Sequence, residues 1–366
     1  MAGQSYPNLS DSELKSVLTF TERVSWNIVR PIIASLGLST GKGRLATNDK
    51  ILDELSKLKK SNQIEFDKKL KSINDLLDGM IMYGEKALFS LDVDKKVVSS
   101  LQKSFTTKWA AMKQKSSLSE EILDKKSISK ISKNHPELIY HTQHNNITTV
   151  IYSSVRDRII QEKVPLQKLP QLSGYDEVIA KRKEKRQCFD LCILTDNRIH
   201  ILIDIRVDSS GENILFSKSS IVRELYQLYG SNFSAKEKDF YPLIDPIFEQ
   251  ASLPFSQHSY KVFDLSFLTN EGTTHKEKKN SSDKDLRDDL FNKEGIKAVG
   301  KIGLYRIGIR IKRNNPQLLL ADNIELIVPG TLRRHLGGSS VSPVSYALLS
   351  KCICKDDFET LARMIL

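Results

Sequence analysis

Apolar residues recur at steps of three and four through the first third of the chain, which is the spacing of amphipathic helices. The first run opens at Ser10 and Glu13, whose spacing is that of a capping box, and it ends near Pro31. Further helical runs cover residues 51–58, which follow the opener Thr47-Asn48-Asp49, and then residues 64–81 and 97–112. Together these runs predict an antiparallel helical bundle.

After residue 135 the apolar positions alternate or cluster in strand-sized pieces. The predicted strands are 189–194, 199–207, 260–268, 303–311, 318–320 and 324–328, and the predicted helices between them are 146–161, 217–229 and 344–366. The fold class is therefore α+β. We expect a helical N-terminal domain, residues 1–130, followed by a mixed, largely antiparallel sheet domain with flanking helices, residues 131–366.

Two segments lack a sustained apolar face. Residues 113–134 are rich in Lys and Ser, which predicts a solvated connection or a frayed helix at the boundary between the two domains. Residues 271–289 are strongly charged and nearly devoid of apolar residues, which predicts a mobile loop on the surface.

The composition is that of a folded protein, since 39% of the 366 residues are hydrophobic and 28% are charged. No uncharged apolar run reaches the ~18 residues that a membrane span needs, and the first residues lack the order of a signal peptide. The four cysteines fit neither a disulfide scaffold nor a standard zinc spacing. We therefore expect a cytoplasmic protein with reduced thiols and no membrane partner.

Basic residues outnumber acidic ones, with 56 Lys and Arg against 45 Asp and Glu, so the formal net charge is +11. This excess favours a polyanion partner, and we expect nucleic acid, in particular DNA. The candidate contacts form three groups, Lys181, Arg182, Lys183, Lys185 and Arg186, then Arg306, Arg310 and Lys312, and finally Arg333 and Arg334. Such groups also occur on ordinary solvated surfaces, so the interpretation depends on the agreement among the three.

Candidate chemistry concentrates in residues 188–206, where two strand-like runs flank the turn residues 195–198. Alternation predicts one apolar and one polar face for this hairpin. A register centred on Asn197 keeps both faces consistent and places Asp190 opposite Asp204, where the two carboxylates repel each other. Either a divalent cation such as Mg²⁺ or an ion pair with Arg206 would neutralise them. Open carboxylates within ~5 Å of each other would favour a metal site, and burial against Arg206 would favour a non-enzymatic scaffold.

These positions resemble the core of the restriction-endonuclease-like, PD-(D/E)xK, superfamily. Asp190 matches its first carboxylate, Asp204-Ile205-Arg206 matches its (D/E)-x-K, and residues 217–229 match the helix that follows. Phe189 stands where the family has Pro, and Arg206 stands where it has Lys; an always-protonated guanidinium stabilises charge but is a poor proton acceptor. The resemblance implies a Mg²⁺ site at Asp190 and Asp204, with Glu177 as a third ligand.

Two functional hypotheses follow from the resemblance and the charge. In the first, the protein is a nucleic-acid-associated component of a bacterial antiviral-defence or mobile-element system. Its nuclease-like core either cleaves phosphodiesters through Asp190, Asp204 and Arg206 or is degenerate and only grips nucleic acid. In the second, it is a non-enzymatic scaffold or adaptor that binds the protein subunits of such a system.

Overall fold

The structure is a computed structural model that describes residues 6–23, 25–112, 118–131, 135–165, 167, 171, 174, 176–207, 210–250, 259–279, 284–313 and 322–366. The chain begins with four helices, α1 (Asp11–Arg23), α2 (Trp26–Ser35), α3 (Arg44–Ser61) and α4 (Gln63–Tyr83). The predicted capping box is confirmed, because the Ser10 N–H donates to Glu13 at 2.7 Å and the Glu13 N–H donates to Ser10 Oγ at 3.4 Å. No helix in the described part of the chain is long and apolar enough to cross a membrane.

Two predicted helix boundaries are wrong. The first run corresponds to two helices, and α2 continues through Pro31 to Ser35. The third helix begins at Arg44, ahead of the predicted opener, and Thr47 lies inside it. The Thr47 hydroxyl instead holds the helix start, since it donates to the Gly43 carbonyl and accepts the Gly41 N–H, both at 2.8 Å.

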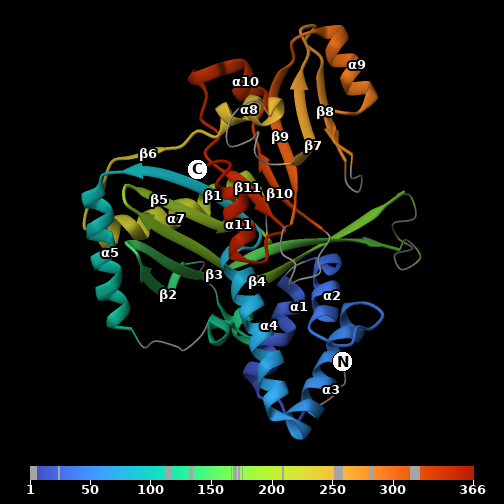
Figure 1. The fold of residues 1–366 in the computed structure, drawn as a ribbon, viewed down its shortest axis with the longest axis vertical. Helices are drawn as coiled ribbons and strands as arrows, with labels where there is room; N and C mark the ends of the chain where they lie inside the picture. Colours follow the sequence, from blue (N-terminus) through green and yellow to red (C-terminus); the bar gives the residue numbers. More distant parts are fainter. Residues whose placement is uncertain are drawn as a thin grey trace.

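The rest of the described chain is built on an eleven-stranded antiparallel sheet with the order β2-β3-β4-β5-β1-β11-β10-β9-β7-β8, and β6 pairs with β1 (Figure 1). Its strands are β1 (Lys86–Val93), β2 (Glu137–His144), β3 (Ile147–Val164), β4 (Val178–Thr195), β5 (Arg198–Asp204), β6 (Ala235–Glu237), β7 (Tyr260–Leu268), β8 (Thr274–Lys278), β9 (Gly303–Lys312), β10 (Asn323–Val328) and β11 (Ala347–Ser350). The predicted α+β class is therefore confirmed.

Helices cover both faces of the sheet. Helices α1–α4 share one hydrophobic core with the sheet, in which Ile73 and Leu77 lie with Leu191 and Leu202. A second core on the other face joins the sheet to α5 (Lys95–Ala110) and α7 (Gly211–Tyr229). The shorter helices are η1 (Leu118–Glu121), α6 (Lys125–Lys130), η4 (Tyr241–Leu243), α8 (Ile244–Glu249), α9 (Leu290–Val299), α10 (Leu332–Gly337), η7 (Gly338–Ser340) and α11 (Lys355–Ala362).

The prediction that residues 1–130 are purely helical is wrong at β1. This strand lies inside the sheet, between β5 and β11, so a boundary at residue 130 would divide the sheet. Seven of its eight residues are buried, and a strand buried on both faces has no alternation to reveal it.

Several other predicted elements also differ. The predicted helix 146–161 is strand β3, and its run Ile147-Thr148-Thr149-Val150-Ile151 is β-branched, which favours a strand. The predicted helix 344–366 contains β11 and α11, and the predicted loop 271–289 contains β8, which pairs with β7. The predicted connection 113–134 contains η1 and α6; residues 113–117 and 132–134, like the predicted strand 318–320, lie outside the described residues.

Strands β3 and β4 extend well beyond their neighbours. Strand β2 pairs with β3 only as far as Ser153, and β5 pairs with β4 only as far as Leu191. Residues 156–164 and 178–186 continue as a two-stranded ribbon, here called the arm, which projects from the sheet (Figure 1, green). The arm begins beside the two candidate carboxylates.

Candidate functional site

The hairpin of β4 and β5 has a different register from the predicted one. Thr195 pairs with Arg198 and Leu191 with Leu202, so the turn is the two-residue Asp196-Asn197 and is not centred on Asn197. A shift of one residue exchanges the faces of one strand relative to the other. Each face of the hairpin therefore combines residues predicted for the apolar face with residues predicted for the polar face. Both faces of the hairpin are buried. The predicted polar face is wrong.

Asp190 and Asp204 are close to each other but not directly opposed. The β4–β5 ladder ends at Leu191 and Leu202, and beyond it each carboxylate bonds the backbone of the other strand. Asp190 Oδ1 accepts the Asp204 N–H at 2.9 Å, and Asp204 Oδ2 accepts the Phe189 N–H at 3.2 Å. The side chains thus take over the role of ladder hydrogen bonds where the strands separate.

Two arginines hold the Asp204 carboxylate. Arg206 Nη2 lies 2.7 Å from Asp204 Oδ2, and Arg23 Nη2, at the end of α1, lies 3.2 Å from the same oxygen. The predicted pairing of Arg206 with a carboxylate is therefore present. The carboxylate is buried, since the side chain of Asp204 is 1% exposed.

Asp190 is held from the arm. Arg156, on β3 at the base of the arm, forms an ion pair with Asp190 Oδ2 and also donates to the Asp204 carbonyl at 2.9 Å. Lys86, at the start of β1, is 1% exposed and donates to the Phe189 carbonyl at 2.6 Å. Arg156 therefore links both aspartates.

The buried cluster, defined here as Asp190, Asp204, Arg23, Lys86, Arg156 and Arg206, contains four cationic and two acidic groups. Burial lowers the pKa of Lys86 to about 8, although Asp204 and Asp190 act in the opposite direction. Burial also lowers the pKa of Arg23 to about 9, and neighbouring Arg206 adds to the effect. The cluster thus carries more positive than negative charge.

The surroundings shift the pKa values of the two carboxyl groups in opposite directions. Burial raises the pKa of Asp190 more than Arg156 lowers it. Burial would also raise the pKa of Asp204, but Arg206, Lys86 and Arg23 outweigh burial and hold that pKa well below its ordinary value. Glu85 is a further acidic group near Arg206, and burial raises its pKa. Even with Glu85 counted as charged, one positive charge remains in excess.

The aspartates do not fit a Mg²⁺ site, because all four carboxylate oxygens already accept hydrogen bonds or ion pairs from Arg156, Arg206, Arg23 and backbone N–H groups. Glu177 is not brought near them. It lies before the far end of β4, 2.8 Å from Lys163, and the 13 residues that separate it from Asp190 span roughly 40 Å of extended strand. Among the described residues, no three His, Cys, Asp or Glu side chains are placed to hold a metal ion.

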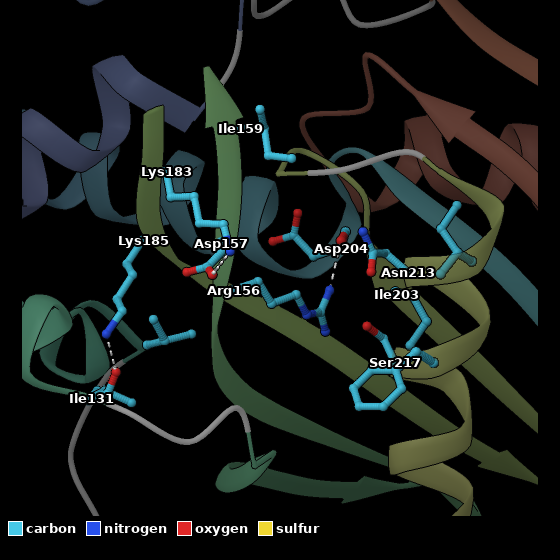
Figure 2. A pocket seen from close by; sticks show the side chains of 13 residues that line it. Ile131, Arg156, Asp157, Ile159, Lys183, Lys185, Ile203, Asp204, Asn213 and Ser217 are labelled. Carbon is cyan, nitrogen blue, oxygen red and sulfur yellow. Dashed lines mark hydrogen bonds and ion pairs between the residues drawn. The ribbon is translucent and has the colours of Figure 1, made fainter. Parts of the chain in front are cut away.

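A pocket of about 340 Å³ opens next to the buried cluster, between the base of the arm and the start of α7 (Figure 2). We call it the arm pocket. Arg156, Lys183 and Lys185 supply its cationic wall, and Asp204 and Asp157 its acidic groups. Lys183 Nζ lies 3.7 Å from Asp157, and Lys185 Nζ donates to the Ile131 carbonyl at 2.6 Å. Ile159 from the arm and Phe216 from α7 line it as well.

The predicted basic contacts fall into three groups. Lys181, Arg182, Lys183, Lys185 and Arg186 all lie on the arm. Arg306, Arg310 and Arg334 are held in ion pairs with Asp264, Glu325 and Asp239 at 2.9, 2.8 and 2.6 Å. Lys312 and Arg333 are exposed. The predicted basic face of residues 303–313 is thus largely neutralised.

Three residues of the buried cluster, Arg23, Lys86 and Arg156, were not among the predicted site residues. Arg156 lies in a segment predicted as a helix, and Arg23 comes from a helix 181 positions away from Asp204 in the sequence. Lys86 could have been recognised from the sequence, because it directly precedes the apolar run Ala87-Leu88-Phe89. A lysine that such a run carries into the core is rarely buried unless it is paired with an acidic group.

Comparison with protein-family models finds no match for this chain, and comparison with curated proteins finds none either. The resemblance to the PD-(D/E)xK core therefore stays a prediction that depends on Asp190 and Asp204-Ile205-Arg206.

Proposed function

We propose that the protein binds nucleic acid through the lysines of the arm and that its nuclease-like core does not cleave it. The observation that carries the proposal is a row of lysines on one face of the arm. Lys181, Lys183 and Lys185 alternate along β4, and the register places Lys163 on the same face. We call these four residues the lysine face.

The lysine face is accessible to a ligand. The side chains of Lys163 and Lys183 are 81% and 74% exposed, and Lys181 is exposed as well. Their acidic neighbours Glu177 and Asp157 are also about half exposed, and such surface pairs contribute only about 0–1 kcal/mol. A phosphate can therefore replace these carboxylates at little cost.

The spacing suits a phosphate backbone. From Lys181 to Lys185 the strand rises about 13 Å. One strand of B-DNA presents a phosphate about every 3.4 Å of helix axis, so the row spans several phosphates. Contacts of this kind hold the backbone without reading bases, which predicts binding with little sequence preference.

The contacts of the Asp190 and Asp204 carboxylates support binding without cleavage. Asp190 and Asp204 are engaged by arginines, and Arg206 is itself held by Asp204, so neither a metal ligand nor a proton acceptor is available there. A place in an antiviral-defence or mobile-element system stays a prediction from the resemblance.

The proposal is tested by titrating labelled duplex and single-stranded DNA at low salt and following fluorescence anisotropy. The triple variant Lys163→Gln, Lys181→Gln and Lys183→Gln should weaken binding on the order of 10-fold or more, because it removes three phosphate contacts. A matched triple, Lys60→Gln, Lys68→Gln and Lys71→Gln, changes three exposed lysines of α3 and α4 and should bind like the wild type.

Equal loss in both triple variants would contradict a specific role for the arm. No binding by the wild type at low salt would reject the proposal and favour the scaffold hypothesis.

A further inference from the structure

The arm pocket shares Lys183 and Lys185 with the lysine face but differs from it in kind. Its volume of about 340 Å³ lies in the range of small-ligand sites and is far too small for a duplex. Its wall is also mixed, with Lys183 and Arg156 near the apolar side chains of Ile159 and Phe216. A ligand that fills it needs both a negative charge and a flat or apolar part.

The apolar part of the wall is exposed to solvent. Phe216 is 61% exposed and Ile159 is 57% exposed, although removing an apolar side chain from water is favourable in free energy. They come from separate elements, α7 and the arm, and both border the same cavity. An exposed phenyl ring at a cationic pocket is suited to stack on a nucleobase, since bases of every type offer an aromatic face.

The charge under the pocket also favours an anion. Arg156 belongs both to the pocket wall and to the buried cluster, which keeps one positive charge in excess when neighbouring Glu85 is counted as charged. Uncompensated buried charge is unfavourable, so an anion in the pocket relieves repulsion within the cluster. The first two turns of α7 line the same pocket through Asn213 and Ser217, and the start of a helix is electrostatically positive (Figure 2).

We propose that the arm pocket binds one unstacked nucleotide of a nucleic-acid strand, with its phosphate at Lys183, next to the positively charged buried cluster, and its base against Phe216. This inference rests on the proposed function, and it names the preferred ligand as single-stranded nucleic acid. The lysine face then holds the backbone on either side of the nucleotide in the pocket. A fully paired duplex can use the lysine face but cannot place a base in the pocket.

The test compares Phe216→Ala with Leu215→Ala, which changes the neighbouring side chain on α7. Leu215 is 43% exposed and is not part of the pocket wall, so it controls for loss of surface apolar area. Phe216→Ala should weaken binding of a single-stranded oligonucleotide on the order of 10-fold and leave duplex binding unchanged. Leu215→Ala should change neither.

A second variant gives a direct readout of stacking. Phe216→Trp should keep the affinity for single strands, and its added tryptophan fluorescence should be quenched by an oligonucleotide but not by a fully paired duplex. Free deoxyadenosine monophosphate should compete weakly for the same site, and deoxyadenosine without a phosphate should not compete.

The outcomes separate the two proposals. If Phe216→Ala binds single strands like the wild type while the arm triple variant is weakened, the pocket assignment is wrong and the arm proposal stands. If the mononucleotide saturates the pocket without displacing the oligonucleotide, the pocket serves a free nucleotide and the strand assignment is wrong. If the wild type binds neither single-stranded nor duplex DNA, the proposed function itself is wrong.

Discussion

The arm and the buried cluster use the same residue types in opposite ways. On the arm, Lys163 lies 2.8 Å from Glu177, and their side chains are 81% and 44% exposed. In the cluster, Arg206 lies 2.7 Å from Asp204, and both are shielded. Exposed pairs exchange partners at little cost, whereas a buried pair that loses one member leaves an uncompensated charge. Exposure therefore decides which cations are free to bind a ligand and which hold the fold.

The largest expected difference between the two regions is in stability. Asp204→Asn should lower the free energy of unfolding by about 3–5 kcal/mol, because it leaves Arg23, Arg206 and Lys86 without their central anion. Asp157→Asn, at the half-exposed pair with Lys183 on the arm, should cost less than about 1 kcal/mol. Urea denaturation of both variants checks this. Similar values for the two would remove the distinction between the regions.

A second test uses pH. The pKa of Lys86 is lowered to about 8, below its ordinary value of 10.5, so between these pH values the unfolded chain binds more protons at this site than the folded protein. The contribution of Lys86 to stability therefore rises as the pH increases from 8 to 10.5, on the order of 3 kcal/mol. Buried thiols such as Cys192, whose pKa burial raises well above its ordinary value, oppose the trend.

The variant Lys86→Met isolates the lysine, because the thiols are common to both proteins. The free energy of unfolding of the wild type minus that of Lys86→Met should increase between pH 7 and pH 10. A difference that is constant with pH would mean that Lys86 is not desolvated in the folded protein.

The smallest expected effect is that of divalent metal. Because Asp190 and Asp204 have their oxygens occupied by arginines and amides, Mn²⁺ should shift the melting temperature by less than about 1 °C, and the wild type should not cleave DNA in its presence. A Mn²⁺-dependent rise of several degrees that disappears in Asp190→Asn would instead establish a metal site.

Local patterns predicted the longer helices and five of the eleven strands, β4, β5, β7, β9 and β10, because capping and apolar periodicity act within a few residues. Ser10 with Glu13 and the run 260–268 are examples, and both appear in the structure. The helix predicted at 146–161 failed because a strand in contact on both faces loses its alternation, and β1 was missed for the same reason. The hairpin register failed by one residue because the turn contains two residues.

The candidate site was only partly predictable. The sequence pattern brought Asp190, Asp204 and Arg206 together correctly. It could not supply Arg23, Lys86 and Arg156, because these come from α1, β1 and β3 and meet the aspartates only through the tertiary fold. These three residues change the site from two facing acids to a cluster with excess positive charge, which favours the ion pair over the divalent cation, the two alternatives that the sequence left open.

The central claim is that the exposed lysines of the arm bind a phosphate backbone. Its most direct test is the slope of log affinity for DNA against log salt concentration, measured for the wild type and for the variant Lys163→Gln, Lys181→Gln and Lys183→Gln. Each lost phosphate contact should reduce the steepness of the slope by about 0.7–0.9, so the variant should be shallower by roughly 2–3. Identical slopes for the two proteins, or a wild-type affinity that does not change with salt, would contradict the claim.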